Sequence, residues 1–380
     1  MQIPTAAAVP QTSRQDEAPA SDGRHDGIDI LRGIAVMGVV LFHCIGMLLW
    51  DVSGTPLVVF KAGWVGVDLF FAISGYVITA SALRKHAVPG YARSFWTARL
   101  ARIVPLYYLT AIVFLLLVTS AALDQDAAFQ LLSHAFFIHN FFVDAAYSIN
   151  GPTWSLSIEM QFYLLAFLLV PLVARAGRKT LIAGYAVLFV AVMACRYFVW
   201  QALGQAGASD AVLSVALSQA PTLVDSFALG GLIRLLGLAA PAIHSTTRTV
   251  LLVLAAFALF LAIYFIYDVY ALRYWSFIGT AVFFRSLIAV FAGVALLAAL
   301  SSPAISRWKW SPLLRIGQVS YGVYLWHWIV LVLVQRYLHA SVGVWVIVII
   351  AITIALSELT LRLVELPVMR WSRGAAKPLS

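Results

Sequence analysis

Long apolar runs recur along the whole chain, and short polar or basic segments separate them. An α-helix needs about 20 consecutive apolar residues to cross the hydrocarbon core of a bilayer. Runs of that length fall at roughly residues 28–50, 63–82, 103–121, 154–174, 180–200, 218–237, 249–268, 280–300, 317–336 and 342–364. The pattern therefore predicts an all-α fold, a polytopic membrane helix bundle of about ten transmembrane helices.

Composition agrees with a membrane protein built as one bundle. The 380 residues are 62% hydrophobic and 11% charged, whereas a soluble domain is about half apolar and about a quarter charged. We expect one transmembrane domain over residues 28–366. Residues 1–27 are rich in Ala, Pro, Ser and Asp, as in disordered tails, and residues 367–380 are expected to form a second tail.

Basic residues are unevenly divided between the two sides of the predicted bundle. With the N-terminus inside, the inner segments hold seventeen Lys and Arg residues, and the outer loops hold only Lys61 and Arg273. By the positive-inside rule, both termini are expected in the cytoplasm. The net charge of +9 is spread over every inner loop rather than gathered on one surface, so we expect no nucleic-acid partner.

Titratable side chains occur inside several predicted spans, where they are costly unless they face protein or water. His43 lies in the outer half of the first span, and His327 lies near the middle of the ninth. Asp68 and Glu159 lie about 8 Å below the outer surface. If their helices face one another, these four side chains form one buried site.

The predicted cytoplasmic side carries a cluster of arginines. Arg32 lies one turn into the first span, and Arg99 and Arg102 lie one turn apart beside the third. Guanidinium groups present fixed forks of donors that suit phosphates. From Arg32 to His43 is 11 residues, ~16 Å of helix. One molecule could therefore bind its phosphates at the arginines and bring its reactive end to His43, and coenzyme A has that shape.

Several motifs together resemble a known family. They are Arg32-x10-His43, GVDLFFAISGYVIT, RLARI, TWSLSIEMQFY, DSFALGGLI and SYGVYLWHW, in this order from residue 28 to about 336. The resemblance is to the acyltransferase-3 family of integral membrane O-acyltransferases, which move acyl groups, usually acetyl, from cytoplasmic acyl-CoA to hydroxyls of sugars and other acceptors. It implies that His43 is catalytic, that Arg32 pairs with it in function, and that Arg99 and Arg102 serve the donor.

We therefore predict transfer of an acyl group, most simply from acetyl-CoA, to a carbohydrate or lipid-linked glycan. The enzyme would act at the outer side of a bacterial cytoplasmic (inner) membrane. His43 would be the general base, and Glu159 or Asp68 would orient its imidazole or balance its charge. His327 and Ser74 are assigned to substrate binding. Direct transfer and an acyl-enzyme through His43 or Ser74 both stay open.

Structural interpretations stand beside these roles. Asp68 and Glu159 are equally well explained as ion-pair partners of an arginine inside the bundle: Arg196, Arg234, Arg285 or Arg362. Ser74 fits helix packing better than a nucleophile, and His327 also fits hydrogen-bonded packing. Arg99 and Arg102 would also serve simply to set the topology.

Two rival functions from other classes are also considered. A polytopic transporter would use the buried charges to move a solute or protons. A non-catalytic scaffold in an envelope complex would leave the alignment of Arg32 and His43 unexplained. No metal is expected, because His134 and His139 are five residues apart, a poor spacing for two ligands on a helix.

Overall fold

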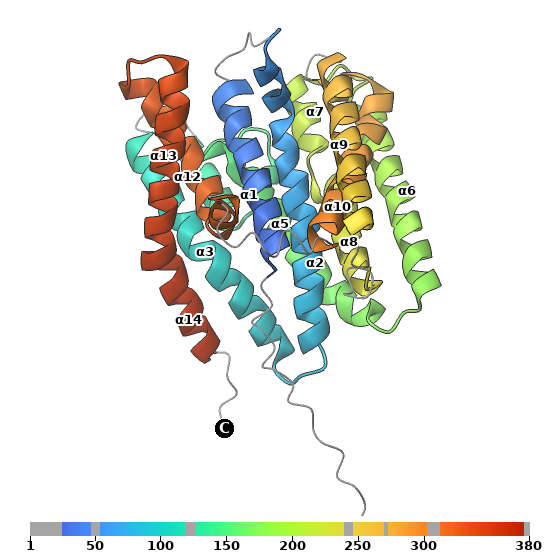
Figure 1. Ribbon diagram of the computed structural model, residues 1–380. Helices are drawn as coiled ribbons and strands as arrows, with labels where there is room; N and C mark the ends of the chain where they lie inside the picture. Colours follow the sequence, from blue (N-terminus) through green and yellow to red (C-terminus); the bar gives the residue numbers. More distant parts are fainter. Residues whose placement is uncertain are drawn as a thin grey trace, which may run out of the picture.

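The computed structural model describes residues 25–46, 54–118, 126–238, 246–269, 273–301 and 312–375, which form helices, turns and loops without a strand. Most of the helices run side by side along one axis (Figure 1). The long helices are α1 (Asp26–Leu41), α2 (Gly66–Lys85), α3 (Tyr91–Leu117), α5 (Trp154–Val173), α6 (Arg178–Leu203), α8 (Ala220–Leu235), α9 (Thr246–Val269), α10 (Ile278–Ser301), α12 (Ser320–Tyr337) and α13 (Val342–Thr360). The shorter ones are α4 (Ala127–Ala135), α7 (Asp210–Ala216), α11 (Pro312–Gln318) and α14 (Leu366–Ala375).

The predicted spans are found as helices. Within the described residues, 8 helices are long and apolar enough to cross a membrane, or up to 10 if each of two bent pairs is one span. These pairs are α7 with α8, bent by 41°, and α11 with α12, bent by 84°. Each predicted apolar run overlaps one of these helices or pairs. The all-α, multi-pass fold is therefore confirmed.

The last span continues beyond its predicted end. The sequence predicts an end at residue 364, but the helix passes through a π-helical turn, Leu361–Glu365, into α14. α14 packs against α3, which keeps this segment ordered as helix. Of the predicted tails, residues 1–24 and 376–380 lie outside the described residues.

Glycines allow some helices to touch backbone to backbone. A Cβ on Gly75 of α2 would lie 1.9 Å from the carbonyl oxygen of Phe227 on α8. A Cβ on Gly317 of α11 would lie 1.6 Å from the carbonyl oxygen of Asp29 on α1. Small residues at such crossings let membrane helices approach closely. At the crossing of Gly317 with Asp29, α11 packs directly on α1, and the two helices together form one wall of the cavity described below.

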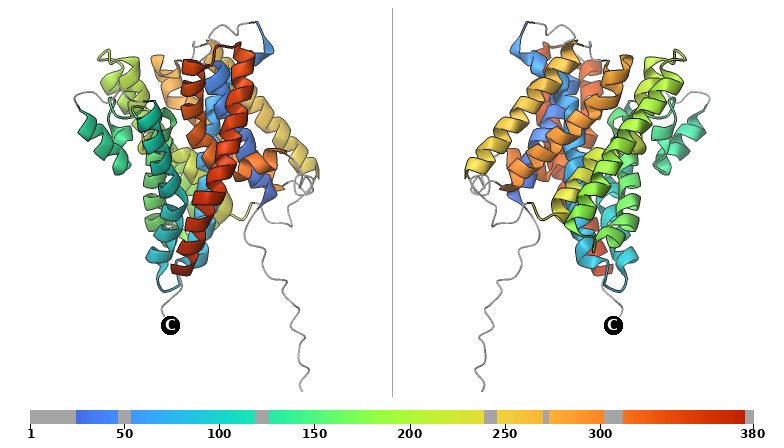
Figure 2. Two further views of the ribbon diagram at one scale, coloured as in Figure 1. Left: turned by 90° about the vertical axis from the view of Figure 1, so that its left-hand side faces the viewer. Right: turned by 90° about the vertical axis from the view of Figure 1, so that its right-hand side faces the viewer.

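The loop between α3 and α5 is tied back to the bundle. Its helix α4 lies at the side of the bundle, near the end opposite the end of α14 (Figure 2). The hydroxyls of Tyr107 and Tyr108 on α3 donate to the carbonyl oxygens of His134 and Ala135, at 3.1 and 2.5 Å. This part of the loop therefore packs on α3.

Candidate active site

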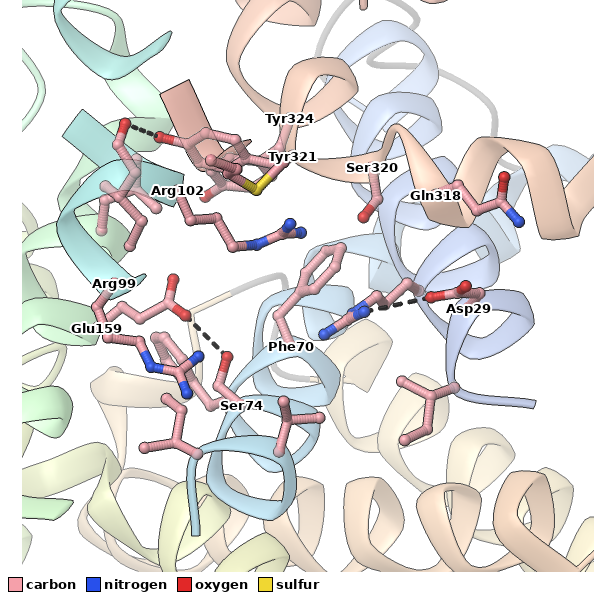
Figure 3. A pocket seen from close by; sticks show the side chains of 18 of the residues that line it. Asp29, Phe70, Ser74, Arg99, Arg102, Glu159, Gln318, Ser320, Tyr321 and Tyr324 are labelled. Atoms are coloured by element: carbon pink, nitrogen blue, oxygen red, sulfur yellow. Dashed lines mark hydrogen bonds and ion pairs between the residues drawn. The ribbon is translucent and has the colours of Figure 1, made fainter. Parts of the chain in front are cut away.

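A cavity of about 620 Å³ lies between α1, α2, α3, α5, α11, α12, the π-helical turn Leu361–Glu365 and α14. Its volume is within the roughly 300–1,000 Å³ typical of small-molecule sites. Its lining includes the arginines Arg32, Arg84, Arg99, Arg102, Arg315 and Arg362. All the arginines predicted to serve a donor thus meet in one cavity, and the predicted residues Glu159 and Ser74 line it too (Figure 3).

Arg99 and Arg102 extend into the cavity from α3, one turn apart (Figure 3). The Arg99 guanidinium lies 5.6 Å from the ring centroid of Phe95 and 5.9 Å from that of Tyr163, within cation–π range. The Arg99 Nε is buried, and no hydrogen-bond partner for it occurs among the described residues. Aromatic rings therefore orient Arg99 while leaving donor capacity for an anion.

Arg32 contributes a guanidinium from α1. Its Nη1 donates to Oδ1 of Asp29 at 3.2 Å, across one turn of the helix. The Asp29 side chain is 5% exposed and that of Arg32 is 22% exposed, so the pair forms part of the cavity wall rather than of the outer surface. The sequence interpretation omits Asp29, although an acid three residues before an arginine on a helix is a recognisable pairing signal.

Glu159 is held by two hydroxyls. Its Oε1 accepts hydrogen bonds from Ser74 Oγ of α2 and from the hydroxyl of Tyr163, one turn further along α5, each at 2.8 Å. Glu159 lies beside Arg99 in the cavity (Figure 3). Ser74 and Glu159, which were predicted for different roles, are therefore hydrogen-bonded to each other. The two hydroxyls fix the Glu159 carboxylate next to the arginines.

The predicted catalytic histidine has a second histidine as its partner. His43 follows α1 in a π-helical turn, Phe42–Gly46, a geometry that often marks functional sites. Its Nδ1 lies 3.1 Å from Nε2 of His327 on α12, and the ring of Trp328 packs against it with 5.1 Å between centroids. His327 is 0% exposed, while His43 is only partly buried. The partner of this imidazole is thus not the expected carboxylate.

Asp68 lies in a different part of the bundle. Its carboxylate pairs with Arg285 of α10 at 2.7 Å and accepts a hydrogen bond from Ser226 of α8 at 3.3 Å. Asp68 and the two histidines are not among the residues that line the cavity. The four titratable groups expected in one site are therefore separated. Asp68 and Ser74 are six residues apart on α2, ~240° around the helix axis, so they face different neighbours.

One aromatic ring separates the cavity from the histidine pair. Tyr324 and Phe70 both line the cavity, with 6.2 Å between their ring centroids. The Tyr324 ring also lies 5.8 Å from that of His327, and its hydroxyl donates to the carbonyl oxygen of Pro152 at 2.8 Å. The cavity thus comes within one side chain of the His43–His327 pair.

His134 and His139 form a stacked pair in the loop between α3 and α5. Their ring centroids are 3.7 Å apart and their planes differ by 7°. Burial lowers the pKa of His134 to about 4, and burial together with the neighbouring His134 lowers the pKa of His139 to about 3. Within the described ranges, no group of three or more His, Cys, Asp or Glu side chains is arranged to hold a metal ion.

Residues 25–361 match the acyltransferase-3 family, described as "Acyltransferase domain". The chain is 28% identical over 366 residues to "Peptidoglycan O-acetyltransferase OatA" of Listeria monocytogenes, which covers 90% of this chain and 55% of that protein. It is 29% identical over 388 residues to "Putative membrane-bound transacylase BcsY" of Komagataeibacter xylinus, which covers 93% of this chain and 87% of that protein.

A third relative is "Putative peptidoglycan O-acetyltransferase YrhL" of Bacillus subtilis, 28% identical over 374 residues, or 90% of this chain and 54% of that protein. This chain thus spans about half the length of OatA and YrhL and most of the length of BcsY. No solved structure matches the chain.

Proposed function

Because this chain belongs to the acyltransferase-3 family, we propose that it is a membrane-bound O-acetyltransferase. It takes an acetyl group from acetyl-CoA, bound in the arginine-lined cavity, and transfers it to a hydroxyl of a glycan. The names of its relatives support this acceptor class, since OatA is named a peptidoglycan O-acetyltransferase.

The arginines of the cavity are the main support for an acyl-CoA donor. Arg99 and Arg102 on α3 and Arg32 on α1 line the same cavity, and the buried Arg99 Nε has no hydrogen-bond partner among the described residues. Coenzyme A carries several phosphates on its nucleotide head, and charge-assisted bonds to guanidinium groups are the strong way to bind them. Asp29 orients Arg32 through their ion pair, and Glu159 places a carboxylate in the same cavity.

The distance between the arginines and the histidines fits the arm of the same donor. From Arg32 to His43 the helix rises ~16 Å, and the cavity extends from the arginines to Phe70 and Tyr324, next to His327. With the nucleotide head at the arginines, the thioester would approach the histidine pair past Tyr324. The two ends of acetyl-CoA then correspond to the two sets of predicted residues.

His43 acts as the general base in this proposal. It removes the proton from the acceptor hydroxyl while that oxygen attacks the thioester carbon. The new C–O bond forms, the C–S bond breaks, and the proton held by His43 passes to the leaving thiolate to give free coenzyme A. The net reaction needs no other reactant.

The sidedness of the reaction rests on the basic residues. The positive-inside rule supports cytoplasmic termini and a cytoplasmic opening for the donor near Arg84 and Arg99. His43 lies toward the other end of α1, which favours an acceptor supplied from the outer face of a bacterial inner membrane. A lipid-linked or surface glycan fits this position.

The decisive experiment uses purified protein in liposomes with radiolabelled acetyl-CoA and a cell-envelope glycan. We expect ester-linked acetyl on the glycan with the wild type, and His43→Ala to lower the rate by roughly 10²–10⁴-fold with unchanged coenzyme A binding. His86→Ala is the matched control, because His86 follows α2 outside the cavity lining.

Full activity of His43→Ala at equal protein level would contradict this mechanism. Saturable solute uptake without any acyl donor, retained in His43→Ala, would instead support the transporter hypothesis. Two buried carboxylates of the bundle, Asp68 and Asp225, are bound in ion pairs with Arg285 and Arg196.

A further inference from the structure

The hydrogen bond between His43 and His327 needs one nitrogen to donate and the other to accept. A neutral imidazole carries one N–H and one bare nitrogen, and which nitrogen carries the hydrogen follows from the partners of the ring. The bond joins Nδ1 of His43 to Nε2 of His327 at 3.1 Å. The His43 ring is also hydrogen-bonded to the backbone of Val39, one turn earlier. The direction of the bond to His327 then decides whether Nε2 of His43 is free to act as a base.

The other nitrogen of His327 determines that direction. Its Nδ1 lies 3.2 Å from the carbonyl oxygen of Val323, one turn earlier on α12. A carbonyl oxygen can only accept, so this nitrogen carries the hydrogen. In a neutral ring Nε2 is then bare and must accept. The hydrogen of the bond between the two rings consequently belongs to Nδ1 of His43.

The surroundings of His327 favour the neutral ring. Its side chain is 0% exposed, and its hydrogen-bond partners among the described residues are the backbone of Val323 and of Tyr324 and the His43 ring. The other titratable group in ring contact is Tyr324, whose hydroxyl is bonded to Pro152 and Ser155. A buried imidazolium without a counter-charge is strongly disfavoured.

We propose that His327 is a positioning residue that holds His43 in the Nδ1–H tautomer and so leaves Nε2 of His43 as the reactive base. The inference rests on the proposed function in taking His43 as that base. When Nε2 of His43 accepts the proton of the acceptor hydroxyl, the Nδ1–H bond to His327 stabilises the imidazolium. A serine-protease aspartate does the same for its histidine, but here the acceptor is a neutral ring.

The tertiary structure is suited to this role. His43 stays partly exposed while its Nδ1 faces the fully buried His327, as a base open to a substrate requires. The Trp328 ring meets the His43 ring at 74° and restricts its rotation. Orientation of His43 thus comes from α12, not from a carboxylate on α2 or α5.

Substitutions at His327 test the role through activity. The amide oxygen of His327→Gln can still accept from Nδ1 of His43, whereas His327→Leu cannot. We expect His327→Leu to lower kcat roughly 10²-fold with an unchanged KM for acetyl-CoA, and His327→Gln to recover about tenfold of that loss. His86→Gln is the control, since His86 also bonds a carbonyl one turn earlier, that of Ala82, but contacts no second histidine.

A spectroscopic measurement tests the tautomer in the wild type, even if the Leu variant does not fold. In the ¹⁵N-histidine-labelled full chain, with His43→Ala for assignment, we expect His43 to show a protonated Nδ1 and a bare Nε2. The opposite tautomer would overturn the inference.

The two proposals fail in different ways. If the wild type transfers acetyl and His327→Leu keeps its kcat within about twofold, the positioning role is overturned and the proposed function stands. If the wild type neither binds acetyl-CoA nor transfers acetyl, the proposed function fails, while the ¹⁵N spectrum still decides whether His327 sets the His43 tautomer.

Discussion

Arg99 of the cavity and the arginines between α2, α6, α8 and α10 belong to one bundle but use their donors differently. Arg285 is bound to Asp68 at 2.7 Å, and Arg196 to Asp225 at 2.8 Å, with all four side chains at most 5% exposed. In the cavity, by contrast, the Arg99 Nε is buried without a hydrogen-bond partner among the described residues. Arg285 and Arg196 are neutralised within the protein, whereas Arg99 retains a donor for a ligand.

This contrast teaches that a buried charge in a membrane bundle is not by itself a functional site. Arg196 also donates to the carbonyl oxygen of Thr222 and to Ser286 Oγ, so its donors are filled by fixed helix neighbours. The same guanidinium group becomes a candidate ligand site only where the surrounding helices leave a cavity. The partners of the side chain, and not its depth, distinguish the two cases.

The largest expected difference between the two regions is in stability. Arg285→Leu leaves the Asp68 carboxylate buried without its partner, which typically costs about 3–5 kcal/mol, so we expect a marked loss of Tm in the purified protein. Replacing both residues by leucine should recover much of that loss. If Arg285→Leu kept the wild-type Tm and lost only acetyl transfer, the comparison would be wrong, and Asp68 would have to be assigned to the active site.

In the cavity we expect a smaller effect, and one on donor binding rather than on stability. Arg99→Leu removes charge-assisted bonds to the donor, each about 1.5–3 kcal/mol, so we expect the KM for acetyl-CoA to rise roughly 10–100-fold with little change in Tm. Arg93→Leu, on the exposed face of the same helix, is the matched control. Equal Tm losses in Arg99→Leu and Arg285→Leu would mean that both arginines are structural.

The smallest effect is expected at Ser74. Ser74→Ala removes one of the two hydroxyls that hold Glu159, while Tyr163 still donates to the same oxygen, so we expect only a several-fold loss of acetyl transfer. Tyr163→Phe removes the other hydroxyl and should act similarly. A loss with Ser74→Ala as large as that with His43→Ala would instead indicate an acyl-enzyme through Ser74.

Much of the cavity could be predicted from the sequence. The one-turn spacing of Arg99 and Arg102 and the position of Arg32 in the first span predict arginines near one end of the bundle, and the structure gathers all of them around one cavity. The positions of these arginines were predictable because the spacing of residues along a helix determines both their depth in the membrane and whether they lie on the same face of the helix.

The partners of the titratable groups were harder to predict. Glu159 and Asp68 have similar predicted depths, yet Glu159 lines the cavity and Asp68 pairs with Arg285. His43 and His327 are expected at nearby depths, but their direct contact joins residues 284 positions apart in the chain. Depth restricts which groups can meet, and the rotation of each helix about its axis decides which of them do.

The sequence by itself determined the all-α class, the run of membrane-spanning helices and the residue types available for chemistry, because the length and apolar content of each segment are local properties. Only the tertiary structure decided which charges neutralise one another, which arginines face a cavity, and which nitrogen of His43 is bound. The physical reason is that lipid and protein interior are both apolar, so the sequence of a span does not say which face meets which neighbour.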